Sequence, residues 1–247
     1  MEYENIREGR FIERINRFVA RVEVCGTEVR AHVKNTGRCR ELLVPGATVY
    51  LEDFAGRMGS RKLRYSLIGV RKGTLLINMD SQAPNQAVKE AFEDGALLLP
   101  DFGQAVKIQP EKTYGESRLD FYIENQNGEK GFVEVKGVTL EAGGIAAFPD
   151  APTERGIKHI QELARAKEEG YYVCALFVIQ MKGVRCFYPN DRTHPQFGDA
   201  LREAEKKGVR ILACDCQVTE TSMKLDSWIP VDLCPQSKFI PDENKGA

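Results

Sequence analysis

The sequence contains none of the short motifs that mark several common enzyme classes. Gly-x-Ser-x-Gly, Gly-x-x-x-x-Gly-Lys and Gly-x-Gly-x-x-Gly do not occur in its 247 residues, so acyl transfer by serine, NTP hydrolysis and dinucleotide chemistry are not indicated. Histidine is scarce, with three residues. His32 and His194 have no evident partner that would support nucleophilic catalysis.

Long apolar runs and a cysteine framework are absent as well. No stretch of about 18 apolar residues occurs, and the N-terminus lacks the basic-then-apolar plan of a secretory signal. The seven cysteines are odd in number and none is spaced Cys-x-x-Cys, which favours buried reduced thiols. Cys214 and Cys216 could ligate a soft metal, but no second pair is nearby. These features predict a cytoplasmic protein that has no contact with a membrane.

The nearly neutral net charge of −1 hides an uneven distribution. Residues 1–80 contain 15 Lys and Arg against 10 Asp and Glu, whereas the rest of the chain contains 20 against 26. An excess of positive charge in the front part attracts polyanions. The same part has short alternating segments separated by turns, and we expect strands at residues 17–25, 28–33, 48–53, 64–71 and 74–79. This pattern predicts a five-stranded barrel of the oligonucleotide-binding (OB) type within residues 1–82.

The cationic side chains of this front unit are candidates for contact with nucleic acid. An isolated surface arginine is usually only solvated, but several on one small barrel are typical of a surface that binds a polyanion. The candidates are Arg17, Arg21, Lys34, Arg38, Arg40 and the segment 61–65.

Residues 83–234 read as a mixed α/β unit. We expect a helix at 85–94, a strand at 105–109, a hairpin, and a helix at 154–169 that Thr153 caps and Gly170 ends. A buried strand at 171–179 with a hairpin partner at 184–188, a helix at 196–207 and a last strand at 209–214 follow. The tail, residues 235–247, is polar and without periodicity, and we expect it to be poorly ordered.

The hairpin carries the chemistry that this sequence indicates most strongly. Leu119, Phe121 and Ile123 alternate with Asp120, and in the second arm Glu134 and Lys136 alternate with valines. A three-residue loop, Gln126-Asn127-Gly128, sets a register that places Asp120 opposite Glu134. Opposed Cβ atoms are roughly 4.5–5.5 Å apart. Two carboxylates at that separation can share one hard cation, Mg²⁺ or Mn²⁺.

Exposed hairpin faces also carry Asp, Glu and Lys as plain solvated pairs, and the pattern alone does not exclude that reading. The surroundings favour a site, because Gly137 follows Lys136 and a constrained segment, residues 143–156, leads into a helix. Asp-x13-Glu-x-Lys in this context resembles the PD-(D/E)xK nuclease superfamily, with Leu119 in place of its proline. The superfamily implies a further ligand on the preceding helix. Glu90 lies about 60° beyond the buried arc of that helix, which fits a ligand and a solvated residue equally well, and Glu116 is a weaker alternative.

Sequence blocks along nearly the whole chain resemble the sugar fermentation stimulation protein A family. The blocks are residues 17–22, 31–38, 81–85, 114–121 and 148–150. This resemblance implies an OB-like barrel followed by a restriction-endonuclease-like α/β domain with a mixed central sheet. It also implies metal ligands at Asp120, Glu134, the Val135 carbonyl and Glu90, catalysis by Asp120, Glu134 and Lys136, and nucleic-acid contacts that include Asn35.

The helix at 154–169 is expected to grip phosphate. Arg155, Lys158 and His159 share its polar side near the N-terminus, where free backbone N–H groups already favour an anion. His159 could instead donate a proton or have only a structural role.

Two functions of different class remain open. The first is a Mg²⁺- or Mn²⁺-dependent nuclease that cleaves DNA. The second is a non-enzymatic regulator, linked to sugar (maltose) metabolism, that binds DNA without sequence specificity. Single-stranded or double-stranded DNA is the expected partner of either, and the oligomeric state is open, a homodimer being one alternative.

Overall fold

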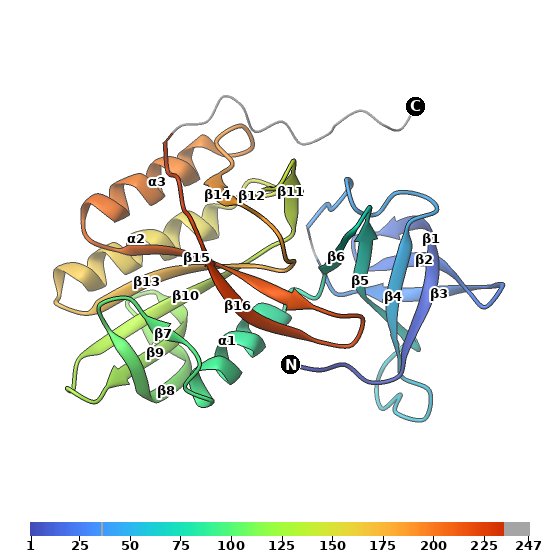
Figure 1. Ribbon diagram of the computed structural model, residues 1–247, viewed down its shortest axis with the longest axis horizontal. Coiled ribbons are helices and arrows are strands. Elements are labelled where there is room, and N and C mark those ends of the chain that lie inside the picture. The colour runs from blue at the N-terminus through green and yellow to red at the C-terminus, as the bar shows by residue number, and fades with distance from the viewer. Residues whose placement is uncertain (36, 235–247) are drawn as a thin grey trace.

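The computed structural model describes residues 1–35 and 37–234, which form two units in contact (Figure 1). The first unit is a closed barrel. Its strands run in the order β3-β2-β1-β4-β5, pairing between β3 and β5 closes it, and β6 adds to β5 outside the closure. The strands are β1 (Ile6–Asn16), β2 (Val19–Val24), β3 (Thr27–Val33), β4 (Thr48–Asp53), β5 (Tyr65–Lys72) and β6 (Leu75–Asn78).

The closed five-stranded barrel confirms the sequence-based prediction in number, but one strand differs. The five expected strands correspond to β2–β6, and β1 was missed. Phe11 is the single fully buried residue of β1, and the register with β2 shifts twice, between Phe11 and Glu13 and between Arg14 and Asn16. Because such bulges break the alternation of inward and outward side chains, β1 carries no clear strand pattern in the sequence.

The second unit is built on a seven-stranded mixed sheet with helices on both faces (Figure 1). The strand order is β16-β15-β13-β10-β9-β8-β7, in which β10, β13 and β15 are parallel neighbours. The strands are β7 (Leu98–Leu99), β8 (Gly103–Tyr114), β9 (Ser117–Asn125), β10 (Lys130–Val138), β13 (Tyr172–Ile179), β15 (Arg210–Val218) and β16 (Met223–Ile229). Helix α1 (Ala83–Glu93) covers one face, and α2 (Glu154–Glu168) and α3 (Pro195–Lys206) cover the other.

Two expectations about the end of this unit are wrong. The segment after β13 does not fold back as its hairpin partner: β14 (Cys186–Pro189) lies in a small separate sheet, parallel to β12 (Ile145–Phe148), which also pairs with β11 (Leu140–Ala142). Both edges of β13 are already occupied, by β10 and β15, so no edge is left for a hairpin. Strand β15 is also not the last, because β16 follows and pairs with it.

Helix α2 begins and ends where the sequence signals predict. The Thr153 side chain accepts a hydrogen bond from the Gly156 N–H at 3.0 Å, which satisfies one of the free donors of the first turn. Gly170, with φ of +91°, follows the end of the helix. These two signals therefore determine where α2 begins and ends, and with that the place of His159 on the helix.

The two units share buried contacts. One apolar cluster includes Phe11 and Leu51 of the barrel as well as Phe177 and Phe197 of the second unit. Gln180, at the end of β13, donates from Nε2 to the carbonyl oxygens of Asn78 and Asp80 at 3.1 and 3.0 Å. Residues of the barrel therefore stand at fixed positions beside the second unit.

All seven cysteines are free thiols, and Cys214 and Cys216 are buried within the sheet. No helix among the described residues has the length and apolarity needed to cross a membrane. The expected polar tail, residues 235–247, lies outside the described residues.

Candidate active site

The turn between β9 and β10 sets the register that the sequence predicts. Gly128 has a left-handed φ of +78°, and the Asn125 N–H donates to the Glu129 carbonyl at 3.0 Å. The strand register then pairs Tyr122 with Phe132 and Phe121 with Val133. Counting on in the same register would set Asp120 against Glu134, but the ladder between the two strands ends at Phe121 and Val133.

Asp120 is held by two donors at the point where β9 meets β10. Its Oδ2 accepts the Val135 N–H at 2.8 Å, and its Oδ1 accepts Nδ2 of Asn85 at 2.8 Å. Asn85 stands in the first turn of α1 and was not expected at the site. Its position directly after Pro84, in the first turn of the helix, was the one available signal.

Glu134 is 1% exposed, and two side chains contact its carboxylate. Its Oε1 accepts Lys136 Nζ at 2.5 Å and also contacts Nδ1 of His159. Arg155 Nε donates to the other ring nitrogen of His159 at 3.3 Å, so Nδ1 is the nitrogen that carries the hydrogen toward Glu134. Oε2 of Glu134 is buried and has no hydrogen-bond partner among the described residues.

The two carboxylates affect each other electrostatically. Burial raises the pKa of Asp120, and the charge of Glu134 raises it further, against the smaller effects of the Val135 N–H and Lys136. Burial also acts to raise the pKa of Glu134, but the hydrogen bond from His159 and the charge of Lys136 outweigh it and hold that pKa below its usual value. The site therefore holds one firmly ionised carboxylate next to one that resists ionisation, an arrangement that an added cation would relieve.

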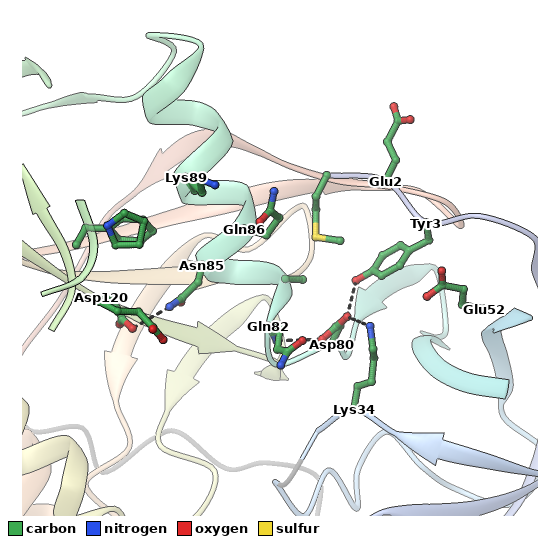
Figure 2. Close-up of a pocket in the computed structure, with 15 residues that line it drawn as sticks. Glu2, Tyr3, Lys34, Glu52, Asp80, Gln82, Asn85, Gln86, Lys89 and Asp120 are labelled. Atoms are coloured by element: carbon green, nitrogen blue, oxygen red, sulfur yellow. Dashed lines mark hydrogen bonds and ion pairs between the residues drawn. The ribbon is translucent and has the colours of Figure 1, made fainter. Parts of the chain in front are cut away.

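A pocket of about 480 Å³ opens between the barrel and the second unit and reaches Asp120. Figure 2 shows Asp120 and Asn85 on one side and Tyr3, Lys34 and Asp80 on the other. Lys34 Nζ pairs with Asp80 Oδ2 at 2.6 Å. We call this space the inter-unit pocket.

Several expected site residues lie elsewhere or have other partners. Glu90 is engaged by the N-terminal amine at 2.5 Å and by Gln86 at 2.8 Å, so it is not among the groups gathered around Asp120. On α1, Glu90 is five residues from Asn85 and thus turned by about 140° from it. Lys158 pairs with Glu116 at 3.1 Å.

His159 is 6% exposed, and its Nδ1 contacts Glu134. It therefore has little access to a phosphate.

The expected nucleic-acid residues of the barrel divide into paired and unpaired groups. Arg21 faces Glu13 at 3.1 Å and Glu28 at 3.7 Å. Asn35 is used locally, since its side chain accepts the Gly37 N–H at 2.7 Å. Arg17 and Arg38 have no carboxylate partner among the described residues.

Comparison with known families agrees with this two-unit architecture. Residues 12–79 match the SfsA N-terminal OB domain, and residues 82–222 match the sugar fermentation stimulation protein RE domain. These two matches define a chain that joins an OB barrel to a restriction-endonuclease-like domain.

Full-length relatives show the family. A sugar fermentation stimulation protein homolog of Desulfitobacterium hafniense is 54% identical over 233 residues, 94% of this chain and 99% of the relative. A homolog of Clostridium beijerinckii is 51% identical over 94% of this chain and 100% of its own length. The chain belongs to the sugar fermentation stimulation protein family.

A solved structure has the same fold. The SfsA protein of Pyrococcus furiosus, solved in complex with Ca²⁺, superposes with a TM-score of 0.82 at 30% identity, covering 94% of this chain and 98% of that chain. The OB barrel and the mixed-sheet second domain are therefore the architecture of a known family member as well.

Proposed function

We propose that this protein is a metal-dependent nuclease that cleaves DNA at the site formed by Asp120, Glu134 and Lys136. One observation carries the proposal: the Asp120 carboxylate is bonded to the backbone N–H of Val135, the residue next to Glu134, and the buried Oε2 of Glu134 has no hydrogen-bond partner among the described residues. A buried carboxylate oxygen without a donor costs folding free energy, on the order of 1–3 kcal/mol or more. A ligand that supplies positive charge at that oxygen removes the cost.

The donors present fit a hard cation. Asp120, Glu134 and the Val135 carbonyl would hold it, and all three supply oxygen, as Mg²⁺ and Mn²⁺ prefer. No group of three or more His, Cys, Asp or Glu that could hold a metal occurs within residues 1–35 and 37–234, so phosphate oxygens and water would complete the shell. The Pyrococcus furiosus relative was solved in complex with Ca²⁺, which supports the proposal of a divalent cation here.

Each side chain of the site has a separate task. The bound cation would supply charge stabilisation at the scissile phosphate. Lys136, 14% exposed and 2.5 Å from Glu134, can orient the attacking water or stabilise developing negative charge. His159 and Asn85 position the carboxylates: His159 contacts one oxygen of Glu134, and Asn85 donates to one oxygen of Asp120. Holding both carboxylates in one geometry is the requirement for a site that must bind metal without rearranging.

A second candidate function is binding of DNA without cleavage, by a regulator of sugar metabolism. The free arginines of the barrel favour it, because they provide positive charge for a polyanion independently of the hairpin. This alternative predicts no hydrolysis by the wild-type protein with any metal.

End-labelled single-stranded and double-stranded DNA, incubated with Mg²⁺ or Mn²⁺, distinguishes the two functions. We expect cleavage by the wild type and a loss of at least about a hundredfold in Asp120→Asn and in Glu134→Gln. Glu124→Gln is the matched control, since Glu124 lies on the same strand but pairs with Lys107 at 2.8 Å. No cleavage by the wild type, or equal cleavage by all four proteins, would overturn the proposal.

A further inference from the structure

One end of the barrel has a pocket whose polar lining is almost entirely arginine. It has a volume of about 390 Å³ and lies between the β1–β2 turn and the segment that follows β3. Arg14, Arg17, Arg38 and Arg40 line it together with Leu43, and no carboxylate does. We call it the arginine pocket.

Arg14 makes this pocket rigid. Its guanidinium donates to four backbone carbonyls, those of Arg17, Asn35, Gly37 and Arg38, at 2.6–2.8 Å. These bonds tie the β1–β2 turn to the segment after β3. The shape of the pocket is therefore set before any ligand arrives, which lowers the entropy lost on binding.

The other three arginines of the pocket are available. Arg17, Arg38 and Arg40 are exposed, and within the described part of the chain none of them forms an ion pair with a carboxylate. Arg21, on β2, differs from these three because it is paired with both Glu13 and Glu28. Three unpaired guanidinium groups around one pocket select an anionic ligand with several charges.

An exposed aromatic ring stands beside one of these charges, that of Arg17. Phe18 is 50% exposed, and the guanidinium carbon of Arg17 lies 5.6 Å from the centre of its ring. The backbone on both sides is fixed, because the Phe18 N–H donates to Asn16 Oδ1 at 2.9 Å and the Phe18 carbonyl accepts the Val33 N–H at 2.8 Å. Phe18 thus offers a positioned, solvent-facing ring next to the guanidinium group of Arg17. Ile15, at the end of β1, and Val44, in the segment after β3, are each 44% exposed.

We propose that the arginine pocket and Phe18 form a binding site for single-stranded nucleic acid, in which a base stacks on Phe18 and Arg17, Arg38 and Arg40 contact phosphates. This inference rests on the proposed function and deepens it by naming the substrate class. A base must be unpaired and accessible to stack on a protein ring, whereas a duplex buries its bases against one another. An acidic protein partner would use the arginines but would not require the flat face of Phe18.

The position of the site suits the proposed chemistry. Lys34 lines the inter-unit pocket that contains Asp120, and Arg38 lines the arginine pocket. Arg38 is four positions after Lys34, which is no more than about 14 Å of extended chain. A strand bound in the arginine pocket therefore lies near the inter-unit pocket, which Asp120 lines.

The test measures binding of fluorescent oligonucleotides to the full chain by anisotropy, in EDTA so that no cleavage occurs. Phe18→Ala should weaken binding of a single-stranded DNA roughly five- to a hundredfold, the value of one base–aromatic stack. Phe18→Tyr should keep the affinity. Trp228→Ala is the matched control, because Trp228 is also an exposed aromatic, 44% exposed, but lies on β16 of the second unit.

Two further arms separate stacking from charge. Phe18→Ala should leave the salt dependence of binding unchanged, and it should not weaken binding of a duplex or of an abasic strand of the same length. The stacking site is overturned if Phe18→Ala binds the single strand as tightly as wild type does, or if it loses the abasic strand equally. Because the assay contains no metal, these outcomes are independent of whether the hairpin cleaves DNA.

Discussion

The barrel and the second unit treat their charged groups in opposite ways. In the barrel, Arg17, Arg38 and Arg40 are exposed and have no carboxylate partner within residues 1–35 and 37–234, which costs little because solvent screens them. In the second unit, Glu134 is buried, and one of its oxygens has no partner in the described part of the chain; burial and the charge of Glu134 together raise the pKa of the neighbouring Asp120. An unpaired group is expensive only when buried. The proposed cation therefore rests on the buried Glu134 and its neighbour Asp120, whereas the proposed nucleic-acid ligand rests on the grouping of three arginines around one pocket.

The largest expected effect tests the catalytic half of this comparison. Lys136→Ala should lower hydrolysis by about two to four orders of magnitude, since the ammonium beside Glu134 is needed where charge develops. DNA affinity should hardly change, because one contact among many contributes little. Single-turnover cleavage and anisotropy on the same preparation measure both quantities.

Lys130→Ala provides the control, since Lys130 begins the same strand and is exposed. Cleavage that survives in both Lys136→Ala and Asp120→Ala would come from another site or from a contaminant, and would break the assignment of chemistry to the hairpin.

The next effect tests the binding half. Replacing Arg17 and Arg38 together by Ala should make the plot of log affinity against log salt less steep, by about 1.5 in slope. It should also weaken single-strand binding about 30-fold at roughly 0.1 M salt. Arg21→Ala should change both much less, because its charge is already balanced by Glu13 and Glu28. Equal effects of Arg21 and of the Arg17/Arg38 pair would show that pairing does not decide which cations bind.

The smallest effect concerns stability of the barrel in acid. Hydrogen bonds from Arg64, outweighing burial, lower the pKa of Asp53 to about 2. An unfolded Asp titrates near pH 3.9, about two units higher, so the ionised pair contributes stability above about pH 4 and loses it as the pH falls toward 2. Urea midpoints of wild type and Asp53→Asn should therefore differ at pH 5 and converge toward pH 2. A difference that stays constant over this range would contradict the role of the ionised carboxylate.

Local signals in the sequence were sufficient to predict the hairpin and α2. The loop that ends at Gly128 fixed which residues face each other, and Thr153 fixed where α2 begins. Strand β1 escaped because its bulges remove the alternation. The pairing of β14 with β12 could not be predicted from the sequence, because it depends on which sheet edges are free, and that is a property of the assembled sheet.

The candidate site was predicted in its hairpin part and missed in its supporting part. Asp120 and Glu134 are joined by a short local turn, whereas His159 and Asn85 come from helices that pack on opposite faces of the sheet. Their contacts depend on how each helix is rotated against the sheet. The rotation of α1 also determines where Glu90 points. Its helical-wheel position was compatible with a ligand and with a solvated residue, and in the structure it lies beside the N-terminal amine.

Calorimetric titration with Mn²⁺ tests the central claim most directly, because it measures the cation site without requiring cleavage. The wild type and Glu124→Gln should each bind Mn²⁺ at a site that the Asp120→Asn/Glu134→Gln double variant lacks. A folded double variant that binds Mn²⁺ as tightly as the wild type would contradict a metal site between the two carboxylates.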